Sequence, residues 1–139
     1  MASSLIDTSA LVAAFGIAQP MSGHYLQLLD RAEREHWALS TTWPCVTEAS
    51  YLLGLPQRYT LLRWLGSGTV MVFPFPQECL IDWSELMERY TEEPRTEMDL
   101  ADASLVWLAM ETDVTTIMTT DLRDFSRYRL PDGRAFEIL

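Results

Sequence analysis

Short strand-like segments alternate with longer helical segments along the whole chain, and this alternation constrains the fold more than any other feature of the sequence. Segments rich in apolar and β-branched residues predict strands at residues 3–6, 37–41, 69–73 and 114–118, with a last edge strand at 136–138. Such alternation is typical of an α/β domain with a mostly parallel central sheet. Because the 139 residues contain no repeat and no linker, we expect one domain spanning residues 1–139.

The segments between the strands have apolar residues at helical spacing and clear end signals. Thr42 is a plausible N-cap, Pro44 stands in a first helical turn, and Gly54 follows the last apolar residue of that segment. We expect helices at residues 10–15, 25–32, 44–53, 59–65, 80–90 and 100–110, and a charged loop at 91–98.

Charge is unusual in this chain. It has 20 acidic residues against 10 arginines and no lysine, for a net charge of −10. This balance argues against generic binding to phosphate backbones, which relies on clustered Lys and Arg. The acids either form a solvated surface or converge on a cation or a basic partner.

Several signals indicate the compartment. Cys45 and Cys79 fit a reducing environment and match no metal or redox spacing. No apolar run approaches the roughly 20 residues that span a bilayer. The apolar run 11–18 has no basic flank before it, and Asp7 precedes it. We therefore expect a cytoplasmic protein that does not bind membranes.

The acids occupy equivalent places in the predicted α/β order. Asp7 ends the first strand, Glu48 lies early in the helix after the second strand, Asp102 opens the helix before the fourth strand, and Asp121 follows that strand. The carboxyl ends of parallel strands and the N-termini of their helices share one edge, where ligands bind. Like charges 4 Å apart repel by about 4 kcal/mol at an effective dielectric of 20, so a cluster of these acids needs protons or a cation. Oxygen-only donors favour Mg²⁺ or Mn²⁺.

Each acid alone also has a structural explanation, because acidic side chains in first helical turns stabilise the helix dipole. Asp7 fits that explanation poorly, since an ionisable group at the end of a buried strand is costly unless it is paired. For Asp99 and Asp102, spaced i and i+3, we expect no helix-stabilising role because like charges at that spacing repel.

Four motifs make the pattern specific. They are Ile6-Asp7-Thr8-Ser9-Ala10-Leu11, Thr47-Glu48-Ala49-Ser50-Tyr51-Leu52-Leu53, Asp99-Leu100-Ala101-Asp102-Ala103-Ser104-Leu105 and Thr119-Thr120-Asp121-Leu122-Arg123-Asp124-Phe125. In this order they resemble the successive motifs of a PIN domain, and the arrangement is similar to bacterial VapC-type toxins and their relatives. The resemblance covers nearly the whole chain. It implies a PIN-like three-layer sandwich with a mostly parallel sheet flanked by helices, and an acidic pocket that binds Mg²⁺ or Mn²⁺ and cleaves RNA.

The resemblance also implies roles for individual residues. The metal-binding and catalytic acids would be Asp7, Glu48, Asp102 and Asp121, with Thr8 or Ser9 as the small polar residue after the first aspartate. Asp99 could share the role of Asp102, and Asp124 would be a supporting acid. From their clustering near the C-terminus, candidates for phosphate contact are Arg123, Arg127, Arg129 and Arg134. Helix-end charges and surface ion pairs explain these arginines as well.

Two functions remain open at this point. The first is a Mg²⁺- or Mn²⁺-dependent endoribonuclease, the toxin of a type II toxin–antitoxin pair, with RNA as substrate, a cognate antitoxin as partner, and a homodimer as the expected assembly. The second is a PIN-like binding module with weak or no catalysis, which the negative charge favours. A phosphotransferase with Asp7 as nucleophile is disfavoured, because position 9 is serine where a second aspartate would stand.

Overall fold

The computed structural model describes residues 2–139, and its centre is a five-stranded sheet in the order β3-β2-β1-β4-β5. The strands are β1 (Ser3–Ile6), β2 (Ala38–Thr42), β3 (Val70–Phe73), β4 (Thr116–Met118) and β5 (Glu137–Ile138). Each neighbouring pair is parallel, so the predicted α/β class is confirmed and the sheet is parallel throughout. The strand order reverses between β1 and β4, and ligand crevices of open α/β sheets lie at such a switch point.

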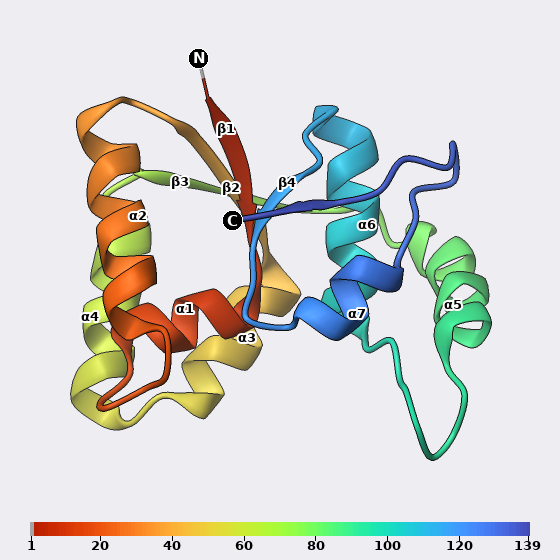
Figure 1. Ribbon diagram of the computed structural model, residues 1–139, viewed down its shortest axis with the longest axis horizontal. Helices are drawn as coiled ribbons and strands as arrows, with labels where there is room; N and C mark the ends of the chain where they lie inside the picture. Colours follow the sequence, from red (N-terminus) through yellow and green to blue (C-terminus); the bar gives the residue numbers. More distant parts are fainter. Residues whose placement is uncertain (1) are drawn as a thin grey trace.

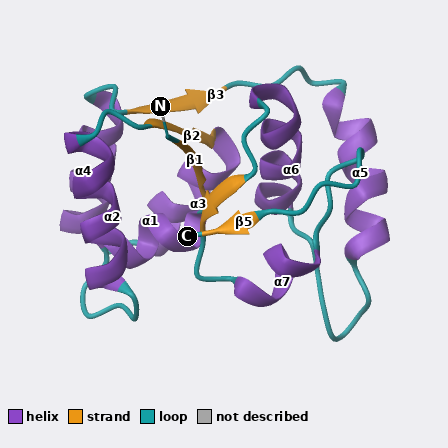
Figure 2. Cartoon of the chain, turned by 45° about the horizontal axis from the view of Figure 1, so that its top comes forward, coloured by secondary structure: helices purple, strands orange, loops and turns teal. Residues whose placement is uncertain are grey.

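Seven helices surround the sheet in the described part of the chain. They are α1 (Thr8–Phe15), α2 (Ser22–Arg34), α3 (Trp43–Leu52), α4 (Leu55–Gly66), α5 (Cys79–Tyr90), α6 (Leu100–Thr112) and α7 (Leu122–Arg127). Figure 1 and Figure 2 show α1, α2 and α4 on one side of the sheet and α5, α6 and α7 on the other. The predicted three-layer arrangement is confirmed. None of these helices is long and apolar enough to cross a membrane.

The period-2 alternation of the central strands divides the core into two halves. Leu5 and Ile117 are buried among residues of α5, α6 and α7, whereas Ile6 and Met118 are buried among residues of α1, α2 and α4. Successive side chains of a strand point to opposite faces, so each central strand supplies both layers. Strands β1 and β4 are thus packed on both faces, which fixes the positions of their ends and of the acids that follow them.

Local sequence accounts for the two helices that carry the third and fourth motifs. Asp99 is the N-cap of α6: its Oδ1 accepts from the backbone N–H of Asp102 at 2.8 Å, and the Asp102 carboxylate accepts from the Asp99 N–H at 3.4 Å. This is a capping box, so the expectation that these two acids have no helix-stabilising role was wrong. The reciprocal bonds to backbone donors outweigh the repulsion between the side chains.

Helix α7 was not expected from the sequence, because six residues are too few for a periodic pattern. Asp121 is its N-cap, and the Asp121 side chain accepts a hydrogen bond from the N–H of Asp124 at 3.1 Å. Its one buried residue, Phe125, packs against Tyr128 and Phe136. Tertiary packing and one cap therefore hold a helix that its length alone would not.

Candidate active site

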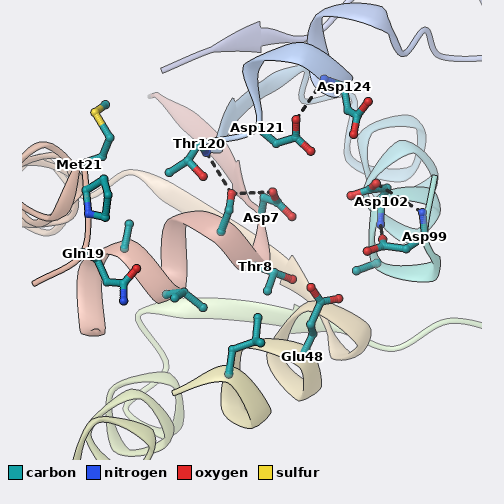
Figure 3. Close-up of a pocket in the computed structure, with 16 residues that line it drawn as sticks. Asp7, Thr8, Gln19, Met21, Glu48, Asp99, Asp102, Thr120, Asp121 and Asp124 are labelled. Carbon is teal, nitrogen blue, oxygen red and sulfur yellow. Dashed lines mark hydrogen bonds between the residues drawn. The ribbon is translucent and has the colours of Figure 1, made fainter. Parts of the chain in front are cut away.

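One cavity of about 610 Å³ collects the predicted acids from four separate segments. Asp7 comes from the end of β1, Glu48 from α3, Asp99 and Asp102 from the start of α6, and Asp121 and Asp124 from the start of α7. Figure 3 shows Asp7 in the centre, below Asp121, beside Asp102 and above Glu48. The cavity lies at the switch point between β1 and β4. Every acid and hydroxyl candidate lines it: Asp7, Thr8, Ser9, Glu48, Asp99, Asp102, Asp121 and Asp124.

A hydroxyl network holds the Asp7 carboxylate. Its Oδ2 accepts from the hydroxyls of Ser9 and Thr119, each at 2.8 Å, and these hydroxyls lie 3.1 Å apart. The Ser9 hydroxyl in turn accepts from the N–H of Thr120 at 3.0 Å, and the Thr119 hydroxyl accepts from the N–H of Asp121 at 3.0 Å. The network joins the end of β1 to the turn after β4, so the positions of Asp7 and Asp121 depend on each other.

The two hydroxyl residues after Asp7 have different roles. Ser9 contacts Asp7 directly, whereas the Thr8 hydroxyl donates to the Cys45 carbonyl at 3.4 Å and so links α1 to α3. The third hydroxyl, from Thr119, lies within the fourth motif, but the sequence did not indicate that it reaches back to Asp7.

Tyr128 is a further site residue that sequence reasoning missed. Its hydroxyl, fully buried, donates to Asp102 Oδ2 at 2.8 Å. The ring stacks edge-on against Phe125 of α7 with centroids 5.1 Å apart. Tyr128 lies outside the four motifs and 26 positions from Asp102, so no spacing in the sequence pointed to it.

Each of the three site aspartates uses one carboxylate oxygen within the protein. Asp7 Oδ2 accepts the two hydroxyls, Asp102 Oδ2 accepts Tyr128, and Asp121 Oδ1 accepts the Asp124 N–H. The second oxygen of each accepts no hydrogen bond from a side chain of residues 2–139. The protein thus orients each carboxylate and leaves a hard oxygen donor on it.

Burial and mutual repulsion raise the pKa values of the site carboxyls. Burial raises the pKa of Asp7 to about 6, although the hydroxyls of Thr119 and Ser9 oppose the shift. The pKa of Asp102 rises to about 8, first through burial and then through the charges of Asp99 and Asp7. Burial is also the main cause of the raised pKa values of Glu48 and Asp121. A nearby cation would reverse these shifts.

The candidate arginines lie outside the cavity. The described lining of the cavity contains none of the four: Arg123, Arg127, Arg129 and Arg134. Arg127 pairs with Asp124 at 3.0 Å, and Arg134 pairs with Asp113 and Asp132. Arg129 donates to the Ser126 and Tyr128 carbonyls, and Arg123 is exposed on α7. Their role in phosphate contact stays a prediction.

The wall of the cavity opposite α6 comes from the connection between α1 and α2. Gln19, Pro20 and Met21 line it. Figure 3 shows Gln19 and Met21 across the cavity from Asp99 and Asp102. This segment lies between the helices expected at residues 10–15 and 25–32, and no site residue was predicted in it. The wall carries no charge, so the negative potential of the cavity is concentrated on the sides formed by α3, α6 and α7.

Comparisons with known proteins agree with this fold. No family model matches the chain. A ribonuclease of Mycobacterium tuberculosis, VapC26, is 28% identical over 139 residues, covering 97% of this chain and 98% of the relative. The crystal structure of VapC20 from the same organism, a toxin that cleaves the sarcin–ricin loop, superposes with a TM-score of 0.73 at 15% identity, covering 86% of this chain and 91% of that one. The chain is thus similar to a VapC-type ribonuclease in sequence and to a VapC-type toxin in fold. The carboxyl edge of its sheet carries the acidic cavity described above.

Proposed function

We propose that this chain is a PIN-domain endoribonuclease that depends on Mg²⁺ or Mn²⁺ and hydrolyses RNA phosphodiester bonds. The observation that carries the proposal is the convergence of Asp7, Glu48, Asp102 and Asp121, from four segments, on one cavity. A ribonuclease and an RNA-cleaving toxin among the similar proteins support it.

The donor set fits a hard divalent cation. Only carboxylate and hydroxyl oxygens converge on the acidic side of the cavity, which favours Mg²⁺ or Mn²⁺ over zinc. The free oxygens of Asp7, Asp102 and Asp121, with the Glu48 carboxylate, would hold it. Among residues 2–139, no three His, Cys, Asp or Glu side chains are grouped closely enough to hold a metal ion as they stand, so the metal remains a proposal.

The chemistry divides between the cation and the protein. When bound, the cation would activate water and stabilise charge on the phosphate oxygens. Ser9 and Thr119 orient Asp7 through its Oδ2, and Tyr128 orients Asp102 through its own Oδ2. Hydrolysis by water would leave a 5′-phosphate and a 3′-hydroxyl. The carboxylates must be ionised to hold the cation, so the raised pKa values of Asp7 and Asp102 in the metal-free chain predict that metal binding strengthens as pH rises.

The partners that accompany this proposal are inferred from the resemblance to VapC-type toxins. We propose that the chain is the toxin of a type II toxin–antitoxin pair and forms a homodimer. An arginine of the antitoxin would complement the acidic cavity, since potentials of opposite sign favour association. The alternative function, a binding module with weak or no catalysis, is favoured by the net charge of −10 and by the absence of arginine from the described cavity lining.

The test of the proposed function is cleavage of assorted RNAs by the purified full chain with Mg²⁺, Mn²⁺ or a chelator. We expect cleavage with either metal, none with the chelator, and 5′-phosphate ends on the products. A chain that gains thermal stability from the metal but cleaves no RNA would support the binding module instead. Cleavage that continues in the chelator would contradict the metal-dependent mechanism.

Replacement of Tyr128 by phenylalanine tests the orienting role of its hydroxyl. The change leaves Asp102 Oδ2 without that buried donor, so the carboxylate is harder to ionise and the metal binds more weakly. We expect cleavage to fall about 10-fold at limiting metal, as for other outer partners of metal ligands, and to recover with excess metal. Tyr90→Phe is the matched control, because the Tyr90 hydroxyl accepts from the N–H of Arg129 outside the cavity. A loss that excess metal does not restore would assign Tyr128 a purely structural role.

A further inference from the structure

A second cavity, of about 690 Å³, adjoins the acidic one. The two share Glu48, Asp99 and Ala101 in their linings, so they are continuous. The rest of the second lining comes from α3, the segment after β3 and the first residue of α6: Trp43, Pro44, Thr47, Tyr51, Phe75 and Leu100. We call it the aromatic groove. A chain lying along it would reach the acidic cavity at Glu48.

Two large aromatic side chains in the aromatic groove are exposed. Trp43 is 52% and Tyr51 81% accessible, although both types normally bury most of their surface. Trp43, Thr47 and Tyr51 lie one turn apart along α3, so they share one face of that helix. Exposed aromatic groups gathered beside a site mark a binding surface more often than isolated ones do.

The floor of the aromatic groove is held rigid. Phe75 stacks on Trp83 with centroids 4.4 Å apart, and Trp107 packs against both rings. Trp83 is nearly inaccessible to solvent. Phe75 therefore presents a fixed ring edge, whereas Trp43 and Tyr51 are free to meet a ligand.

The net charge of the chain indicates which kind of contact would bind RNA in the aromatic groove. An RNA nuclease with a net charge of −10 and no lysine gains little from neutralising phosphates. Arg127 and Arg134 are paired with acids of the chain, and Arg58 donates to the carbonyls of Ser50 and Leu53 at the end of α3. Part of the affinity for RNA therefore has to come from contacts that do not depend on charge. Stacking of bases on aromatic side chains is such a contact, worth about 1–3 kcal/mol per base, and it tolerates any sequence.

We propose that the aromatic groove is a base-stacking subsite, where Trp43 and Tyr51 bind unpaired nucleobases next to the phosphate in the acidic cavity. This inference rests on the proposed function and assigns Trp43 and Tyr51 as the side chains that contact the bases beside the scissile phosphate. Bases within a duplex are stacked on each other and offer no free face to these rings. Neutral bases also tolerate Glu48 and Asp99 nearby, where a second phosphate would be repelled.

The test measures binding of a short fluorescent single-stranded RNA by anisotropy in the Asp7→Asn background, which removes cleavage. We expect Kd to rise about 10-fold on adding Trp43→Ala or Tyr51→Ala, and Trp43→Phe, which keeps a ring, to retain most of the affinity. Tyr59→Ala is the matched control: Tyr59 is a half-exposed aromatic on α4 outside both cavities, and its loss should leave Kd unchanged. The same RNA with abasic sites beside the scissile bond should bind weakly to the parent and no more weakly to Trp43→Ala, because the two changes remove the same contact.

The outcomes separate this inference from the proposed function. Equal Kd values for the parent and both alanine variants would overturn the stacking subsite, even if the wild-type chain cleaves RNA. A change of oligomeric state on Trp43→Ala, seen by light scattering, would assign the groove to a second copy of the chain and also overturn it. Failure of the wild-type chain to cleave any RNA would count against the proposed function, while the binding comparison would still decide the role of the groove.

Discussion

The Asp7→Asn variant is expected to lose at least about 100-fold in RNA cleavage while becoming more stable than the wild-type chain at pH 7.5 in the absence of metal. The loss follows because the amide removes the charge that would hold the cation. A bound metal stabilises the transition state by several kcal/mol, and each increment of about 1.4 kcal/mol corresponds to a tenfold change in rate. The gain follows because the Asp7 carboxyl, with a pKa near 6, is ionised at pH 7.5 inside the fold. Relieving that cost should raise the free energy of unfolding by about 1–3 kcal/mol.

Cleavage and chemical denaturation of the same preparations measure both effects. The matched control is Glu111→Gln, an exposed acid on α6 outside the cavity, which should change neither quantity. An Asp7→Asn chain that is inactive because it has unfolded would show that Asp7 is structural. A stable variant that retains cleavage would remove Asp7 from the site.

The second large effect is the pH dependence of stability. Asp7 and Asp102 have folded-state pKa values raised to about 6 and about 8, so between pH 4 and pH 8 the folded chain binds more protons than the unfolded chain. Their contribution to stability is therefore complete below pH 4 and is lost as pH rises through the folded pKa values. Without metal, we expect the free energy of unfolding to fall by a few kcal/mol, about 3 for Asp7 alone, from pH 4 to pH 8. The lowered pKa values of Glu35 and Asp132 act the other way, but both groups are exposed and contribute little.

A divalent cation should reverse this loss. Binding requires Asp7 and Asp102 to release their protons, so metal affinity rises with pH. At a metal concentration 100 times Kd the stabilisation is about 2.7 kcal/mol. We expect Mn²⁺ to raise Tm clearly at pH 8 and hardly at pH 5, measured by scanning calorimetry with the same samples in chelator. An equal rise of Tm at both values of pH would mean that the metal binds away from these two carboxyls.

The topology explains why so much of the site could be predicted from the sequence. Parallel strands direct their carboxyl ends to one edge, so an acid after β1 and another after β4 must meet there once the strands pair. The hydrogen bond from Asp7 N–H to the Met118 carbonyl, at 3.0 Å, is the point where the two segments join. The structure brings Asp7 and Asp121, which are 114 positions apart in the sequence, to the same cavity.

The parts that escaped prediction depend on contacts between segments without periodic patterns. Nothing local indicates that Tyr128 reaches Asp102. Its hydroxyl comes there because its ring packs on Phe125 of α7, which in turn packs against β5. The capping role of Asp99 was not predicted for a different reason. Repulsion between Asp99 and Asp102 is evident from the sequence, but the hydrogen bonds that each carboxylate accepts from the other residue's backbone N–H are not. The first N–H groups of a helix have no partner within it, and Asp99 and Asp102 accept from such groups while also lining the cavity.

The central claim is that Asp7, Glu48, Asp102 and Asp121 form one cation site, and anomalous diffraction from a crystal soaked in Mn²⁺ tests it most directly. We predict a manganese peak in the acidic cavity of the wild-type chain, within about 2.0–2.4 Å of carboxylate oxygens from at least two segments, including Asp7. The peak should be absent from crystals of Asp7→Asn treated in the same way. A manganese-soaked wild-type crystal with no peak in that cavity, or with peaks only at other carboxylates, would contradict the claim.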